Sequence, residues 1–152
     1  MTASLQKLAT SWAVIDRPYS GEKTIIALVV VVLVHLAVNL VHGSAHTAAG
    51  VELGPAGLAF VIIVILIGPM AGLALMLVNR QFGALVIMLT MLAALVFGLV
   101  NHFIIPGADR VDYVHGDSHA LFETTAVMLA IIELAAVALA IAYRRSAISR
   151  IS

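Results

Sequence analysis

Four long apolar stretches constrain most strongly what this chain can fold into. They cover about residues 24–44, 55–78, 83–105 and 118–143, and each is long enough for a helix to cross a hydrocarbon core of about 30 Å. Because backbone polar groups inside lipid must be satisfied internally, only helices and closed barrels span membranes. The sequence therefore predicts an all-α, integral membrane four-helix antiparallel bundle forming a single domain over 1–152. Since the connections are short, consecutive helices are expected to be neighbours.

The composition of the whole chain agrees with a membrane protein. Of its 152 residues, 62% are hydrophobic and 11% are charged, against about half and about a quarter in soluble domains. The formal net charge is zero, which gives no indication of a nucleic-acid partner. The lack of cysteine excludes disulfides and thiolate metal sites. The lipid bilayer is thus the first partner that the sequence predicts, and a homo-oligomer or a larger membrane complex remains open.

Two local features refine the expected bundle. At the N-terminus, about residues 3–16 are predicted to form an amphipathic helix in the membrane interface, with an ordinary surface helix or loose tail as the alternative. Its apolar residues recur at helical spacing: Leu5, Leu8, Trp12 and Ile15. In the second stretch, the proline of Gly68-Pro69 removes a backbone hydrogen bond and should kink the helix.

The basic residues predict which way the helices point. Seven of them flank the stretches on one side of the membrane: Lys7, Arg17, Lys23, Arg80, Arg144, Arg145 and Arg150. Only Arg110 lies on the other side, in the loop between the third and fourth stretches. Because short cytoplasmic loops are enriched in Lys and Arg, the sequence predicts a multi-pass protein of the plasma (inner) membrane with both termini cytoplasmic.

All six histidines are expected in the opposite, extracytoplasmic half of the bundle. Five lie at the outer ends of the first, third and fourth stretches or in the loop beside them: His42, His46, His102, His115 and His119. His35 lies deeper, about 10–14 Å below the outer end of its helix at 1.5 Å per residue. Residues that are far apart in the sequence are therefore expected to converge.

Helical spacing places several of these side chains on common faces. At about 100° per residue, His35, Asn39, His42 and His46 form one polar stripe if the first helix continues to position 46. His119 shares a face with Glu123 on the fourth helix. Polar side chains inside a membrane usually face the bundle interior, where they find partners.

Imidazole and carboxylate groups together suit a borderline divalent metal, so the sequence predicts a transition-metal site near the outer membrane face, with Zn, Fe or Cu as the ion. The main candidate ligands are His42, His46, His119 and Glu123, followed by His102 and His35 and last by His115 in the loop. Asp112 or Asp117 could orient an imidazole from behind, although Asp117 also stands where the N-cap of the fourth helix should be. Glu133, much deeper, is expected to be a paired structural carboxylate or a proton-relay group.

Three classes of function remain open from the sequence. The first is a metal-binding membrane protein, whose enzymatic role is not fixed by any complete catalytic constellation. Its two H-x-x-x-H spacings are similar to the histidine boxes of membrane di-iron desaturases and hydroxylases, which carry more histidines and place them on the cytoplasmic side. The second is a membrane cytochrome in which His35 and a histidine of another helix ligate haem b. The third is an accessory subunit of a larger membrane complex, without a site of its own.

Overall fold

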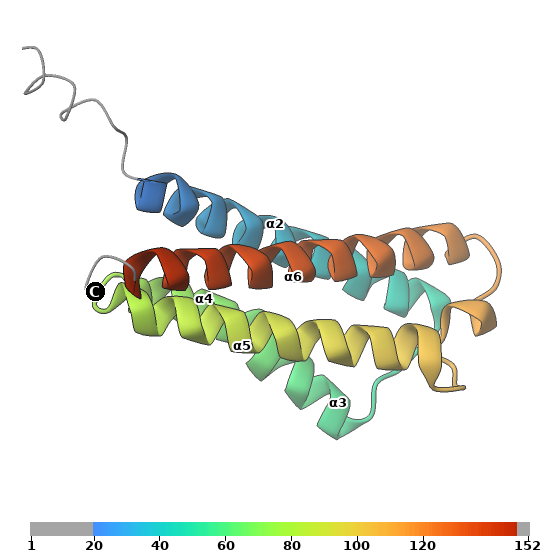
Figure 1. Ribbon diagram of the computed structural model, residues 1–152. Coiled ribbons are helices and arrows are strands. Elements are labelled where there is room, and N and C mark those ends of the chain that lie inside the picture. The colour runs from blue at the N-terminus through green and yellow to red at the C-terminus, as the bar shows by residue number, and fades with distance from the viewer. Residues whose placement is uncertain (1–19, 149–152) are drawn as a thin grey trace, which may run out of the picture.

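The computed structural model describes residues 20–148, which form four long helical segments (Figure 1). The first is α2, Ser20–Ala49, and the last is α6, His119–Ile148. The third consists of α5, Arg80–Leu99, continued by the π-helical turn η2, Val100–Ile104. The N-terminal interfacial helix expected at about 3–16 lies outside the described residues.

The second helical segment is built from three successive pieces. These are α3, Pro55–Phe60, the π-helical segment η1, Val61–Ile67, and α4, Gly68–Met76. A turn over residues 77–79 joins α4 to α5, and the loop before α6 contains the short 3₁₀ helix η3, Val111–Tyr113.

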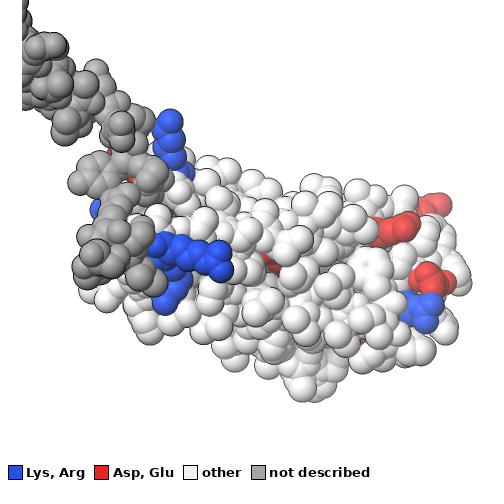
Figure 2. Space-filling view, in the orientation of Figure 1, with Lys and Arg blue, Asp and Glu red and all other residues white. Residues whose placement is uncertain are grey.

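All four helical segments are long and apolar enough to span a membrane, which confirms the predicted helical architecture. The apolar spans cover between 22 and 28 residues, and no strand occurs in the described range. Figure 2 shows charged side chains gathered at the two ends of the molecule, with a largely uncharged band between them. Large apolar side chains such as Leu40, Ile63 and Ile131 are more than 60% exposed, as expected for residues that face lipid rather than water.

The helices are not all neighbours in chain order. α6 packs against α2 on one side and against α5 on the other, and α5 packs in turn against α4. α2 touches α4 only slightly, although the two segments follow each other in the chain. α3 has no buried residue and diverges from the other helices (Figure 1). The expectation that consecutive helices are neighbours therefore fails for the first two.

The divergence of α3 begins at the irregularity that Gly68-Pro69 predicts. Since Pro69 has no N–H, the carbonyl of Ile65 loses its α-helical partner. The backbone widens into a π-helix over Val61–Ile67, and the N–H of Gly68 donates to the carbonyl of Ile63, five residues back. This wider turn redirects α3 away from the helices against which α4 is packed.

The main core lies in the half of the bundle where α4 and α5 are joined. Its buried residues come from all four segments: Leu28, Val32, Met76, Ala84, Ile87, Met91, Ala136, Ala140 and Tyr143. Two glycines allow α4 and α5 to approach closely here. A Cβ on Gly83 would lie 2.4 Å from the backbone nitrogen of Met76, and one on Gly72 would lie 2.6 Å from Cγ1 of Ile87. Small residues at such contacts let membrane helices pack backbone to backbone.

We expect Gly83→Ala to lower the free energy of unfolding by about 1–3 kcal/mol, since the new methyl group overpacks against the backbone of Met76. The loss should appear even though alanine has the better helix propensity. Thermal unfolding in detergent, followed by circular dichroism, measures it. The matched control is Gly57→Ala in α3, whose Cβ would meet nothing closer than 3.5 Å. Equal melting temperatures for the two variants would contradict the close packing.

Candidate metal centre

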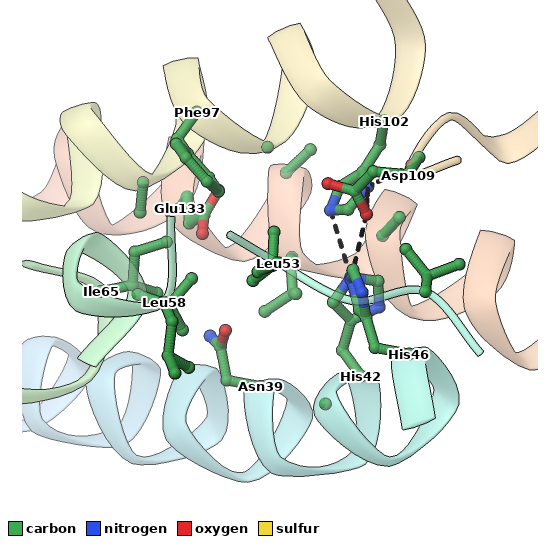
Figure 3. A pocket seen from close by; sticks show the side chains of 18 of the residues that line it. Asn39, His42, His46, Leu53, Leu58, Ile65, Phe97, His102, Asp109 and Glu133 are labelled. Atoms are coloured by element: carbon green, nitrogen blue, oxygen red, sulfur yellow. Dashed lines mark hydrogen bonds and ion pairs between the residues drawn. The ribbon is translucent and has the colours of Figure 1, made fainter. Parts of the chain in front are cut away.

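Three histidines from two helical segments converge at one end of the bundle (Figure 3). His42 and His46 lie one turn apart on α2, and His102 lies in η2. Nε2 of His42 is 3.2 Å from Nε2 of His46 and 3.2 Å from Nε2 of His102. One ring nitrogen of each residue lies within 4.8 Å of the others, so the three could hold a metal ion. We call these three residues the histidine cluster.

Local backbone features position the cluster. α2 continues beyond His46, as the polar stripe requires, and ends at Ala49, where the following Gly50 has a φ of 66° that suits glycine. At the other segment, Pro106 favours an extended conformation for Ile105, which has φ −77° and ψ 126°. The N–H of Ile105 reaches back five residues to a carbonyl, and the resulting π-helical turn carries His102. Such turns inside helices are frequent at functional sites.

An aromatic ring from α6 supports the cluster. Phe122 is fully buried, and its ring centroid lies 5.0, 4.8 and 5.3 Å from those of His42, His46 and His102. It belongs to a second apolar group, consisting of Ala45, Val51, Val111, Val114 and Phe122. Phe122 thus covers the three imidazoles with apolar surface on one side, which limits their access to water there.

A hydrogen bond determines which ring nitrogen of His42 carries a proton. Nδ1 of His42 lies 2.8 Å from Oγ1 of Thr125, and the Thr125 hydroxyl donates to the carbonyl of Leu121 at 2.6 Å. Because a hydroxyl has a single hydrogen, Thr125 must accept the bond from Nδ1–H of His42. Nε2 of a neutral His42 therefore presents a lone pair to the other two histidines.

His102 is held in the same state by a different acceptor. Its Nδ1 lies 2.9 Å from the backbone carbonyl of Asp109, which can only accept, so this nitrogen carries the proton. Nε2 of a neutral His102 then also presents a lone pair, 3.2 Å from Nε2 of His42. Two lone pairs that face each other repel. The contact therefore requires a positive species, either a proton or a metal ion.

The two nitrogen separations from His42 are compatible with a shared metal ion. At metal–nitrogen bonds of about 2.0–2.1 Å, neighbouring ligands of a tetrahedral ion are about 3.3–3.4 Å apart. The two Nε2 separations of 3.2 Å from His42 are close to this value. Three protein ligands would leave at least one coordination position for water or a substrate.

Asp109 places a negative charge beside the cluster. Its Oδ1 lies 3.3 Å from Nε2 of His46 and 3.3 Å from Nδ1 of His102. Within residues 20–148, neither of its buried carboxylate oxygens has a partner in hydrogen-bond geometry, and the same holds for Nδ1 of His46. Burial alone would raise the pKa of Asp109, but the adjacent His102 ring and the nearby His46 outweigh it and hold the pKa below its ordinary range. The side chain is an anion that would balance a bound cation.

The other expected ligands lie outside the histidine cluster. His119 and Glu123 pair with each other across one turn of α6 at 3.5 Å, and their side chains are 41% and 51% exposed. His115 is exposed in the loop and makes no hydrogen bond or ion pair with the described residues. His35 lies deeper in the bundle, where its Nε2 is 3.0 Å from Oε1 of Glu133.

The structure thus differs from the order of preference given by the sequence. It places His102 beside His42 and His46, whereas His119 and Glu123 lie apart from them. His119 is the first residue of α6, and Phe122, one turn further in, takes the place facing the cluster.

Sequence reasoning also missed two residues that contact the cluster, Asp109 and Thr125. The only signal for Asp109 was the concentration of acidic residues in its loop. Of the other two acidic residues there, Asp112 pairs with Arg110 and Asp117 is exposed.

A cavity of about 380 Å³ adjoins the cluster (Figure 3). It lies between α2, the diverging second segment, α5 and α6. The histidine cluster and Asp109 line one end, and Asn39 and Glu133 lie further along, beside Leu58 and Ile65 (Figure 3). The rest of the lining is mostly apolar and includes Phe97 and Leu129.

Comparisons with known proteins assign no family to the chain. No protein-family model, curated protein or solved structure matches it. The function must therefore be inferred from the site's own residues and geometry.

We expect Thr125→Val to lower the free energy of unfolding of the metal-free protein by about 1–3 kcal/mol, because Nδ1–H of buried His42 loses its acceptor. Denaturation in detergent with a chelator present measures the change. Thr124→Val, at the exposed neighbouring position, is the matched control and should leave stability nearly unchanged. A Thr125→Val protein as stable as this control would contradict the assigned hydrogen bond.

Proposed function

We propose that this chain is a small integral membrane protein that binds a transition-metal ion through Nε2 of His42, His46 and His102. One arrangement carries the proposal: Nδ1 of His42 and Nδ1 of His102 each face an acceptor, so in the neutral rings the two Nε2 atoms direct lone pairs at each other. A metal ion accepts one lone pair from each of the three histidines at once. The buried Asp109 carboxylate supports the proposal, since it offsets part of the ion's charge.

The donor set favours a borderline divalent ion. Three imidazole nitrogens with a carboxylate nearby suit Zn²⁺, Fe²⁺ or Cu²⁺. A three-histidine site with an open position is the ligand pattern of catalytic zinc centres, in which the ion lowers the pKa of bound water. A metalloenzyme acting on a substrate that enters the cavity is the extension of the proposal that this pattern supports.

The geometry favours a metal ion over haem b. The axial ligands of a haem bind its iron from opposite faces of the macrocycle, whereas the three Nε2 atoms of the cluster converge within a few ångströms of one another. His35, the ligand expected for a haem, is instead paired with Glu133 at 3.0 Å.

Wild-type protein, purified in detergent, stripped with a chelator and dialysed against Zn²⁺, should bind about one ion per chain. His42→Ala and His102→Ala should abolish stoichiometric binding, because each removes a ligand. Asp109→Asn should weaken zinc binding by about 10–100-fold, as loss of a carboxylate that contacts metal-binding histidines typically does. Elemental analysis and competition with a chromogenic chelator provide the measurements.

His119→Ala is the matched control for these variants and should bind Zn²⁺ like the wild type. Circular dichroism melting separates lost ligation from lost folding, and His46→Ala provides a further ligand variant at a less buried position. Sub-stoichiometric zinc in the wild type, or loss of binding in His119→Ala but not in His42→Ala, would overturn the site.

We further propose that the cluster lies at the extracytoplasmic end of the bundle, on the basis of the basic residues at the opposite end. The chain has no cysteine, so single cysteines can report the topology. A membrane-impermeant maleimide applied to intact cells should label Asp117→Cys, near the cluster, but not Val78→Cys in the turn between α4 and α5. Val78 is 90% exposed, so permeabilised cells should label both. The reverse pattern would refute this orientation.

A further inference from the structure

The cavity beside the histidine cluster is a feature that ion binding alone does not explain. Its volume of about 380 Å³ falls within the range of about 300–1,000 Å³ that small-molecule sites occupy. Protein interiors are otherwise packed to the density of organic crystals, since unfilled space forfeits dispersion contacts. This cavity is partly open at the surface of the bundle, and its size and mostly apolar lining suit a small apolar ligand.

The cavity walls keep this space open. On one side, the second segment leans away at its π-helical piece, η1. On the other, α5 and α6 contribute small residues: Ala94, Gly98, Ala126 and Ala130. A Cβ on Gly98 would meet no atom closer than 3.9 Å, so the space there would accommodate a larger side chain. The sequence thus places small side chains where large apolar ones would have closed the bundle.

Few polar residues line the cavity. The cluster and Asp109 occupy one end, Asn39 and Glu133, with Glu133 held by His35, lie further along, and Thr47 and Glu52 are the other polar lining residues. Along α2, Asn39 lies about 4.5 Å from His42, and along α6 Glu133 lies about 12 Å from Thr125, which contacts His42, at 1.5 Å per residue. The apolar walls can contact only apolar groups favourably.

We propose that this cavity binds a lipid-soluble, amphipathic molecule with an oxygen-containing head group at the histidine cluster and a short apolar chain directed toward Glu133. Binding of the head group rests on the proposed metal site, where its oxygen would fill the open coordination position of the ion. Binding of the ligand's apolar tail rests on the apolar walls alone.

The test uses the full-length protein in lipid nanodiscs and two series of probes. Acetohydroxamate, hexanohydroxamate and octanohydroxamate carry a metal-ligating head group, whereas 1-hexanol and 1-octanol carry an oxygen head group without strong ligation. Isothermal titration calorimetry measures the affinity of each probe, referred to its free concentration in water. This affinity should increase about fourfold per methylene. The increase should stop once the alkyl chain has covered the apolar lining, because further methylenes find no more apolar surface in the cavity.

The matched variants are Ala130→Leu, which fills part of the cavity, and Ala135→Leu, at an exposed position of the same helix. Ala130→Leu should weaken octanohydroxamate and 1-octanol binding by about tenfold or more through overpacking. It should leave zinc and acetohydroxamate binding unchanged, because neither needs the apolar walls. Ala135→Leu should behave as the wild type with every probe.

The outcomes separate the two proposals. If zinc binds but affinity is independent of chain length, or if Ala130→Leu and Ala135→Leu bind octanohydroxamate equally well, the cavity inference fails and the metal site stands. If zinc does not bind, the metal site fails, and 1-octanol still decides the cavity, since equal binding by the two variants would overturn it.

Discussion

In a bundle whose helices are apolar enough to span a membrane, a buried polar side chain is costly unless it finds a partner within the protein, and this constraint organises one end of the structure. Nδ1–H of His42 donates to the hydroxyl of Thr125 in α6, and Nδ1–H of His102 donates to the backbone carbonyl of Asp109 in the loop. These bonds link α2, α6 and the end of the third segment. They also direct both Nε2 atoms inward, so the requirements of the protein backbone and hydroxyl groups create a set of aligned lone pairs.

The two halves of the bundle divide the tasks of stability and function. Backbone-to-backbone packing at Gly72 and Gly83 holds α4 against α5 in one half, with the main core around it. In the other half, the π-helical η1 turns α3 aside and leaves the cavity beside the histidine cluster. The irregular segments, η1 and η2, thus lie next to the site, while the regular helices anchor it.

The helices could be predicted from the sequence because lipid imposes both their length and their composition. The proximity of His42 and His46 followed as well, since it depends only on i, i+4 spacing within one helix. The choice of His102 over His119 did not follow. It depends on which helices are neighbours and how far each is rotated about its axis, whereas periodicity describes each helix separately. Asp109 lies in a loop, where no periodicity exists, and its approach to His46 depends on the path of residues 105–118.

A purely hydrogen-bonded cluster would leave the same atoms in conflict. Nε2 of His42 has one lone pair but two nitrogen neighbours at 3.2 Å, so only one of them can donate to it. If His102 is protonated, its Nε2–H can donate to Nε2 of His42. The lone pair of His42 is then occupied, and Nε2 of His46 still faces it. Asp109 would have only the ion pairs of Oδ1 with His46 and His102 at 3.3 Å, while its buried Oδ2 would lack a partner among the described residues, and an incompletely paired buried charge is costly. A divalent ion removes both conflicts, because it takes a lone pair from each ring and places positive charge beside the carboxylate.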